Sequence, residues 1–186
     1  MFDKPVTFHF ETSSLLVRNI LLQDKKVIYD LYTDPGVVRF DSNAGLNSIE
    51  QAEQFIRHLA DPYANPDSIR WAIIQKESGK VIGTCGFRNW DKLNHHAEIG
   101  GNILSDYWRQ GYATELVPKL LEYGFLQLHL NKVHAYTNVK NKAVVRLLDK
   151  YGFKKEGVLR DYQLINGKYA HVYVYGKLKR EHLMVK

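Results

Sequence analysis

"YWRQGYATELV", residues 107–117, is the stretch on which the interpretation of this sequence depends. It places Gly111 and the small Ala113 directly before apolar residues at helical spacing. A helix start leaves about four backbone N–H groups unpaired and carries a partial positive charge. Gly111 lets the backbone approach a ligand, and Arg109 adds a permanent charge suited to phosphate oxygens. The stretch predicts either a phosphate site or a helix start whose glycine serves packing.

The segments on either side of this stretch predict alternating strands and helices. Residues 96–104 read as a strand, in which the pair Gly100-Gly101 indicates a bulge or a close backbone approach. After the helix, residues 132–139 predict a strand and residues 141–153 a short helix. Pro118 lies inside the helix that follows Gly111, where it removes a backbone hydrogen bond. It therefore predicts a kink or an irregular first turn in that helix.

The remaining segments complete an α/β pattern. Helices are expected at 24–34 and 48–61, the second with Ser48 and Gln51 as a capping box, and a turn-rich loop at 40–47. The dipeptide Asn166-Gly167 predicts a final hairpin, and further strands are expected at residues 14–20, 70–76 and 81–87. The order predicts one domain over residues 1–186, with a mixed central sheet.

Composition limits the class of protein. The 186 residues contain no apolar run near the roughly 20 that a membrane helix needs, and the N-terminus shows no signal-peptide pattern. The single cysteine, Cys85, excludes an internal disulfide framework and indicates a reducing, cytoplasmic location. The formal net charge of +6 fits nucleic acid, ribosomes or a polyanionic cofactor as partners, or only a basic surface.

Three segments together resemble the GNAT superfamily of acetyl-CoA-dependent N-acetyltransferases. They are "LLVRNILLQD" (15–24), "AEIGGNILSDYWRQGYATE" (97–115) and "NKAVVRLLDKYGFKKEGVLRDY" (141–162). Within the superfamily the chain is most similar to the Rim-type (RimJ/RimL-like) ribosomal-protein N-acetyltransferases. The resemblance covers nearly the whole chain. It implies a sheet that is splayed at a bulged strand, with helices on both faces.

The resemblance also implies where acetyl-CoA binds. The superfamily's pyrophosphate loop falls on residues 108–113, with Trp108 where Gln or Arg is usual. Pantetheine would pair with the backbone of residues 103–104, beside two asparagines of the next unit. The implied cofactor-binding residues are Ile103, Leu104, Arg109, Gln110, Gly111, Tyr112, Ala113, Thr114, Asn138 and Asn141. The two asparagines also suit turn formation and N-capping.

The implied chemistry is direct transfer of acetyl from the thioester to an amine. Glu98, on the glycine-marked strand, is the expected general base, acting through one water; alternatively it is a salt-bridged strand residue. A backbone N–H near Leu104 is expected to stabilise the oxyanion. Cys85 is expected in the core. The family's Ser and Tyr positions for a general acid fall on Val144 and Leu148, which cannot donate a proton, so that role stays unassigned among Tyr151, Tyr162 and Tyr169.

The acceptor is left open between two classes of amine. The first is the α-amine of a protein N-terminus, for example that of a ribosomal protein, which has a pKa near 8 and needs only a modest base. The alternative is a small amine, such as a polyamine or an amino-sugar. A non-catalytic CoA- or ribosome-binding module is a third reading. Asn89 and Trp90 are expected to line the acceptor groove, and the histidines show no metal-ligand spacing. Exposed hairpin edges leave a homodimer open.

Overall fold

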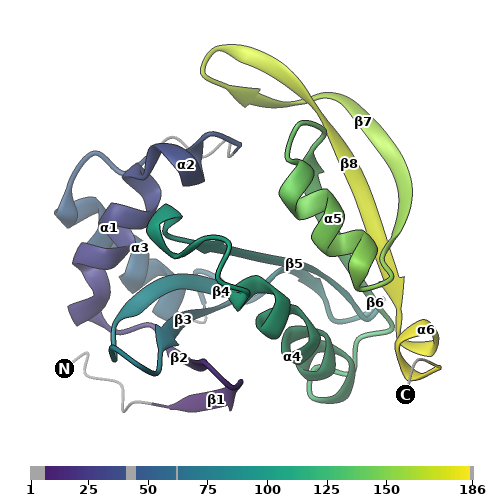
Figure 1. The fold of residues 1–186 in the computed structure, drawn as a ribbon, viewed down its shortest axis with the longest axis horizontal. Coiled ribbons are helices and arrows are strands. Elements are labelled where there is room, and N and C mark those ends of the chain that lie inside the picture. The colour runs from purple at the N-terminus through teal and green to yellow at the C-terminus, as the bar shows by residue number, and fades with distance from the viewer. Residues whose placement is uncertain (1–6, 41–44, 62, 185–186) are drawn as a thin grey trace.

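The computed structural model describes residues 7–40, 45–61 and 63–184. They form one eight-stranded sheet in the order β1-β2-β3-β4-β5-β6-β8-β7 (Figure 1). The strands are β1 (Phe8–Glu11), β2 (Leu15–Asn19), β3 (Ile69–Gln75), β4 (Val81–Asp91), β5 (His96–Ile103), β6 (Lys132–Asn138), β7 (Lys154–Ile165) and β8 (Lys168–Leu178). The helices are η1 (Leu22–Asp24), α1 (Lys25–Thr33), α2 (Pro35–Val38), α3 (Ile49–Ala60), η2 (Ser105–Tyr107), α4 (Tyr112–Leu126), α5 (Lys142–Lys150) and α6 (Lys179–Leu183).

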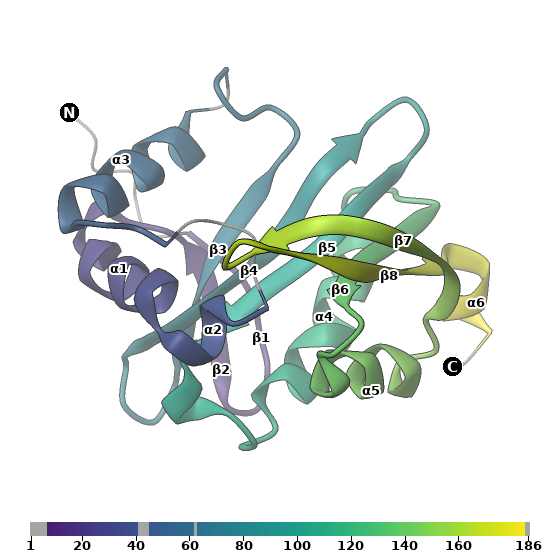
Figure 2. The same ribbon diagram turned by 90° about the horizontal axis from the view of Figure 1, so that it is seen from above.

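Helices cover both faces of the sheet. Figure 2 shows α1 and α3 on one side of β4 and β5, and α4 and α5 on the other. Two separate apolar cores match this arrangement: the larger contains Phe125 of α4 and Leu148 of α5, and the smaller contains Ile28 of α1 and Ile56 of α3. The expected α/β fold with a mixed sheet is confirmed. Among the described residues, no helix is long and apolar enough to cross a membrane.

The sheet changes character between β5 and β6. The two strands run parallel and pair at only three positions, where His96–Glu98 lies beside 132–134. Beyond this point β5 stays paired with β4, while β6 stays paired with β8 along its whole length. The expected splay is therefore confirmed, and it opens directly after Glu98.

The prediction of a bulge at Gly100-Gly101 is wrong. Pairing of β5 with β4 keeps one register across both glycines. A Cβ atom at Gly101 would lie 2.9 Å from the carbonyl oxygen of Thr84, so this glycine permits a close strand approach. The register shift lies in β4 instead, between Arg88 and Asp91, and includes Asn89 with a φ of 51°.

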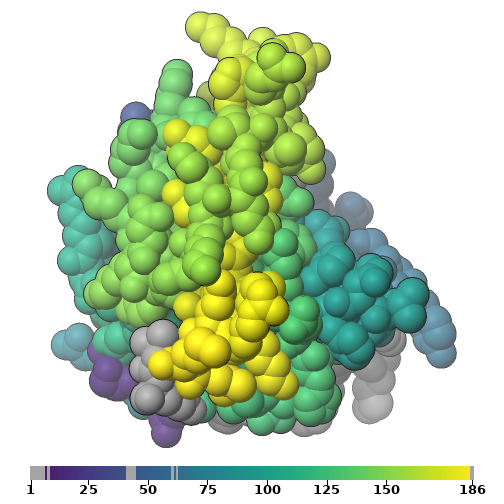
Figure 3. All heavy atoms as spheres, turned by 90° about the vertical axis from the view of Figure 1, so that its right-hand side faces the viewer, coloured from purple at the N-terminus to yellow at the C-terminus, as the bar shows by residue number. Residues whose placement is uncertain are grey.

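Local sequence signals predicted most helices and strands correctly. Ser48 caps α3 by accepting a hydrogen bond from the N–H of Gln51, and Asn166-Gly167 closes the β7–β8 hairpin with both residues at positive φ. The chain also forms β1 and the short helices α2 and α6, which were not predicted. Residues 41–44 of the expected 40–47 loop lie outside the described residues. Figure 3 shows the β7–β8 hairpin, in yellow-green, rising above the rest of the molecule.

Candidate active site

The loop before α4 exposes the start of that helix. Arg109 and Gly111 both adopt positive φ, at 62° and 86°, and Gly111 is the N-cap. The first helical bond runs from the N–H of Glu115 to the carbonyl of Gly111. The N–H groups at positions 112–114 therefore have no helical acceptor. Apart from Gly111 and its two chain neighbours, no atom of the described residues would lie within 4 Å of a Cβ at this position, so the loop is open beside these donors. An exposed helix start of this kind can bind an anion.

Side chains of this loop have different surroundings. The side chain of Arg109 is exposed. The amide of Gln110 donates to the carbonyl of Asp106 at 3.1 Å. Tyr112 is buried, and its hydroxyl accepts a hydrogen bond from Gln75. Of these three, only Arg109 brings a charged side chain, while Gln110 and Tyr112 offer mainly backbone groups.

Trp108, the departure from the superfamily pattern, has a structural contact. Its indole nitrogen donates to the carbonyl oxygen of Ile103 at 2.6 Å, and its ring edge lies 3.0 Å from the position of a Cβ at Gly36. The indole thus connects the loop before α4 to the end of β5 and to α2. A Gln or Arg at this position would not fill the same space.

The two residues expected beside pantetheine differ in their backbone bonds. Leu104 donates its N–H to Ile82 and accepts from the N–H of Tyr107, so both groups are engaged. The oxyanion donor expected near Leu104 is therefore not the N–H of Leu104 itself, and the prediction stays open for its neighbours. Hydrogen-bonded and non-hydrogen-bonded pairs alternate along antiparallel strands, so the N–H of Ile103 faces away from β4, toward the splayed side, while its carbonyl oxygen already accepts from the Trp108 indole.

The asparagines after β6 organise the next turn. Asn138 is buried, and its side-chain oxygen accepts from the N–H of Lys140 at 2.9 Å. The side chain of Asn141 caps α5 by accepting from the N–H of Val144 at 3.3 Å. Both turn-forming roles are confirmed.

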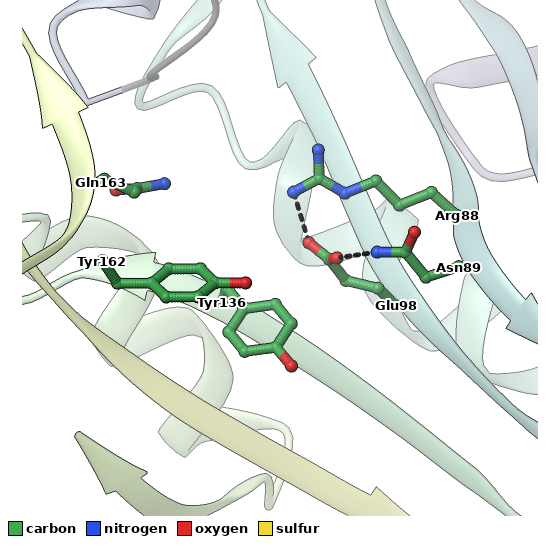
Figure 4. Close-up of a pocket in the computed structure, with 6 residues that line it drawn as sticks. All are labelled: Arg88, Asn89, Glu98, Tyr136, Tyr162 and Gln163. Carbon is green, nitrogen blue, oxygen red and sulfur yellow. Dashed lines mark hydrogen bonds and ion pairs between the residues drawn. The ribbon is translucent and has the colours of Figure 1, made fainter. Parts of the chain in front are cut away.

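A cavity of about 370 Å³ lies where β5 and β6 separate (Figure 4). Glu98 is only 3% exposed there. Its two carboxylate oxygens accept hydrogen bonds from Arg88 at 2.5 Å and from Asn89 at 3.1 Å. The β4 register shift is what brings Asn89 to the carboxylate. The lining residues are Arg88, Asn89, Glu98, Tyr136, Tyr162 and Gln163.

An aromatic pair forms the opposite wall of the cavity. The rings of Tyr136 and Tyr162 stack with their centroids 5.9 Å apart and their planes at 22°. Burial, with the nearby Tyr162 and Glu98, raises the pKa of Tyr136, so its hydroxyl keeps its proton at neutral pH. The cavity thus combines a carboxylate, a guanidinium, two amides and two phenols.

The structure separates the candidate residues into three groups. Asn89 and Glu98 meet in the cavity. Trp90 does not line it, because its ring packs against the larger core and lies under the ammonium of Lys92. Arg88, Tyr136 and Gln163 were missed, because strand residues of these types carry no local signal for a site.

Three further candidates lie outside the cavity, and their surroundings do not favour proton or acyl transfer. Cys85 is fully buried, which raises the pKa of its thiol to about 12. The hydroxyl of Tyr151 donates to the backbone carbonyl of Thr114, and Tyr169 is 70% exposed outside the cavity lining. Among the described residues, no three His, Cys, Asp or Glu side chains could hold a metal ion together.

Known proteins share both this sequence pattern and this fold. A family model described as "Acetyltransferase (GNAT) domain" matches residues 14–154. An uncharacterized N-acetyltransferase, p20 of Bacillus licheniformis, is 37% identical over 171 residues, which make up 92% of this chain and 96% of p20.

Two solved structures share the fold. The spermidine N-acetyltransferase of Vibrio cholerae, in complex with CoA and spermine, superposes with a TM-score of 0.82 at 24% identity, covering 92% of this chain and 99% of the other. The ribosomal-protein-S5-alanine acetyltransferase of Vibrio fischeri also gives 0.82, at 21% identity, covering 91% and 96%. At these identities the likeness is one of fold.

Proposed function

Because the chain belongs to the GNAT family and is an acetyl-CoA-dependent acyltransferase, we propose that it acetylates the α-amine of a protein N-terminus. The observation that carries this proposal is the position of the cavity. It lies at the point where β5 and β6 separate, with the exposed start of α4 at the far end of β5. A thioester in the gap between the strands would reach the cavity.

We assign the phosphates of acetyl-CoA to the exposed start of α4. The N–H groups at positions 112–114 supply donors, Gly111 gives access, and Arg109 adds charge. We assign pantetheine to the splayed side of β5, where the N–H of Ile103 faces the gap. We assign Asn138, at the end of β6, and Asn141, at the start of α5, to the same arm of the cofactor.

The charge of the cavity supports an N-terminus over a polyamine. Among the described residues, its lining contains one carboxylate, Glu98, which is already paired with Arg88. A polyamine carries several ammonium groups and needs uncompensated carboxylates beside them. An α-amine becomes neutral by losing one proton, near a pKa of 8. The nearly neutral lining therefore favours an acceptor with one amine.

In the proposed reaction the neutral amine attacks the thioester carbonyl directly. Its lone pair forms the C–N bond, the C–S bond breaks, and the CoA thiolate leaves. Glu98 receives the amine proton through one water. The proton lost by the amine balances the one that the leaving thiolate gains. Because Cys85 is buried, no acyl-enzyme is formed on it.

A small amine is the second candidate acceptor. The observation in its favour is the fold shared with the spermidine enzyme of V. cholerae. The ribosomal-protein enzyme of V. fischeri superposes with the same TM-score as the spermidine enzyme. Within the leading proposal, a ribosomal protein is the favoured target.

Thiol release tests the proposal. Purified enzyme is incubated with acetyl-CoA and peptides that begin with Ser, Ala or Leu, and separately with spermidine, spermine and glucosamine. We expect turnover with at least one peptide and a kcat/KM for every small amine at least tenfold lower. Turnover of a polyamine alone would refute the N-terminal acceptor.

A further inference from the structure

A bulge in β7 places two successive side chains in the same cavity. In a regular strand, neighbouring side chains point to opposite faces. Pairing of β7 with β8 shifts register between Leu159 and Gln163, and Asp161 has a φ of 50°. The alternation is broken there, so Tyr162 and Gln163 both line the cavity. A bulge that redirects side chains beside a site is a common structural device.

A side chain of β8 holds the bulge. The backbone N–H of Asp161 donates to the Nδ1 atom of His171 at 2.9 Å, and the Asp161 carboxylate lies 3.2 Å from the same atom. Positive φ is unfavourable for a residue with a side chain, so this contact offsets a local backbone strain.

The bulge gives Gln163 a position from which it can bind a ligand. Its Oε1 atom is buried and has no hydrogen-bond donor among the described residues. The amide nitrogen lies on the side of Glu98 and Arg88, and the hydroxyl of Tyr162 points toward the Glu98 carboxylate (Figure 4). A primary amide in this position can exchange hydrogen bonds with another amide, such as a peptide bond.

We infer that the β7 bulge is an acceptor-recognition device, in which Gln163 binds the first peptide bond of the acceptor and Tyr162 covers its amine. This rests on the proposed function. A peptide offers a carbonyl oxygen two bonds from the reacting amine's carbon, whereas a polyamine or alkylamine offers none. His171 and Asp161 are positioning residues, because they act through Tyr162 and Gln163.

The first test compares two acceptors in two proteins. An Ala-starting peptide and isopropylamine, which lacks the carbonyl group, are assayed with wild-type enzyme and with Gln163→Leu. We expect the variant to lose roughly three- to tenfold in kcat/KM for the peptide and nothing for isopropylamine. Amine basicity cancels, because each acceptor is compared with itself. Equal losses for both acceptors, or none for the peptide, would overturn the inference.

The second test addresses the positioning residues. In His171→Leu we expect the KM for the peptide to rise while kcat and the KM for acetyl-CoA stay unchanged. His171→Asn should restore the wild-type KM, because its side-chain oxygen can replace Nδ1 as the acceptor. Tyr169→Ala, on the same hairpin and 70% exposed, is the matched control. An unchanged peptide KM in His171→Leu would overturn the positioning role.

Hydrogen exchange separates this inference from the proposed function. The Asp161 N–H should exchange faster in His171→Leu than in wild-type protein or in His171→Asn, whatever the acceptor is. If no peptide is acetylated, the proposed function fails, while exchange still reports on the bulge. If peptides are acetylated but Gln163→Leu behaves as wild type, only the recognition inference fails.

Discussion

The hydroxyl of Tyr151 donates a 2.5 Å hydrogen bond to the carbonyl oxygen of Thr114. Pro118, four residues after Thr114 in α4, has no N–H to donate to that carbonyl. Tyr151, at the end of α5, therefore supplies the donor that the helix lacks. This contact accounts for how α4 accommodates an interior proline, and it joins α5 to the first turn of α4.

Removing this donor should destabilise the protein only while Pro118 is present. We expect Tyr151→Phe to lower the free energy of unfolding by about 1–2 kcal/mol, since it leaves a partly buried carbonyl unpaired. In a Pro118→Ala background, position 118 regains a backbone N–H that can bond the carbonyl of Thr114, so the same change should cost much less. Urea unfolding of the four proteins measures this coupling. Equal costs in both backgrounds would disprove it.

A side chain at Gly111 should block acetyl-CoA. In Gly111→Ala the methyl group fills the space over the donors of α4, and we expect the Kd for acetyl-CoA to rise more than tenfold by calorimetry. The φ of 86° adds a strain of about 1–2 kcal/mol. Gly79→Ala carries the same kind of strain, at a φ of 67°, and should bind acetyl-CoA normally. A Kd that does not change in Gly111→Ala would mean that the phosphates bind elsewhere.

Replacing Glu98 should slow transfer without preventing binding. Glu98→Gln keeps the shape of the side chain and an acceptor oxygen, but it cannot take a proton. We expect kcat to fall by roughly 10²- to 10⁴-fold, with little change in the Kd for acetyl-CoA. Glu53→Gln is the matched control. It removes a carboxylate of α3 that is paired with Lys25 of α1 and Arg57 of α3. Wild-type turnover in Glu98→Gln would remove this residue as the base.

Acid should destabilise the fold through a half-buried histidine. Burial lowers the pKa of His134 below its ordinary value of 6.5. As the pH falls below about 6.5, the unfolded chain takes up this proton before the folded protein does, which favours unfolding. We expect the Tm to fall from pH 7.5 to 5.5, and to fall less steeply in His134→Gln. A parallel decline in both proteins would assign the pH effect to other groups.

Local sequence signals predicted the elements better than the site. The helix start at Gly111 and the final turn at Asn166-Gly167 were predictable because glycine and asparagine tolerate positive φ. The bulges at Asn89 and Asp161 were not, because they depend on contacts with Glu98 and His171 in other strands. Such contacts exist only after the sheet has formed.

The position of the splay was predictable only in part. Its existence followed from the family resemblance, but the glycine pair suggested the wrong cause. The gap opens because β5 follows β4 while β6 follows β8, a competition between strand partners that no single segment encodes. Tyr136 enters the cavity for the same reason, since it lies just beyond the last residue of β6 that pairs with β5.

Only three paired positions between β5 and β6 join the two halves of the sheet. Acetyl-CoA bound in the gap would bridge them, and a ligand at 100 times its Kd adds about 2.7 kcal/mol to the stability of the folded state. The protein's resistance to proteolysis should therefore rise and fall with the acetyl-CoA concentration around it. By this coupling, the two half-sheets would be joined most firmly while the cofactor is bound.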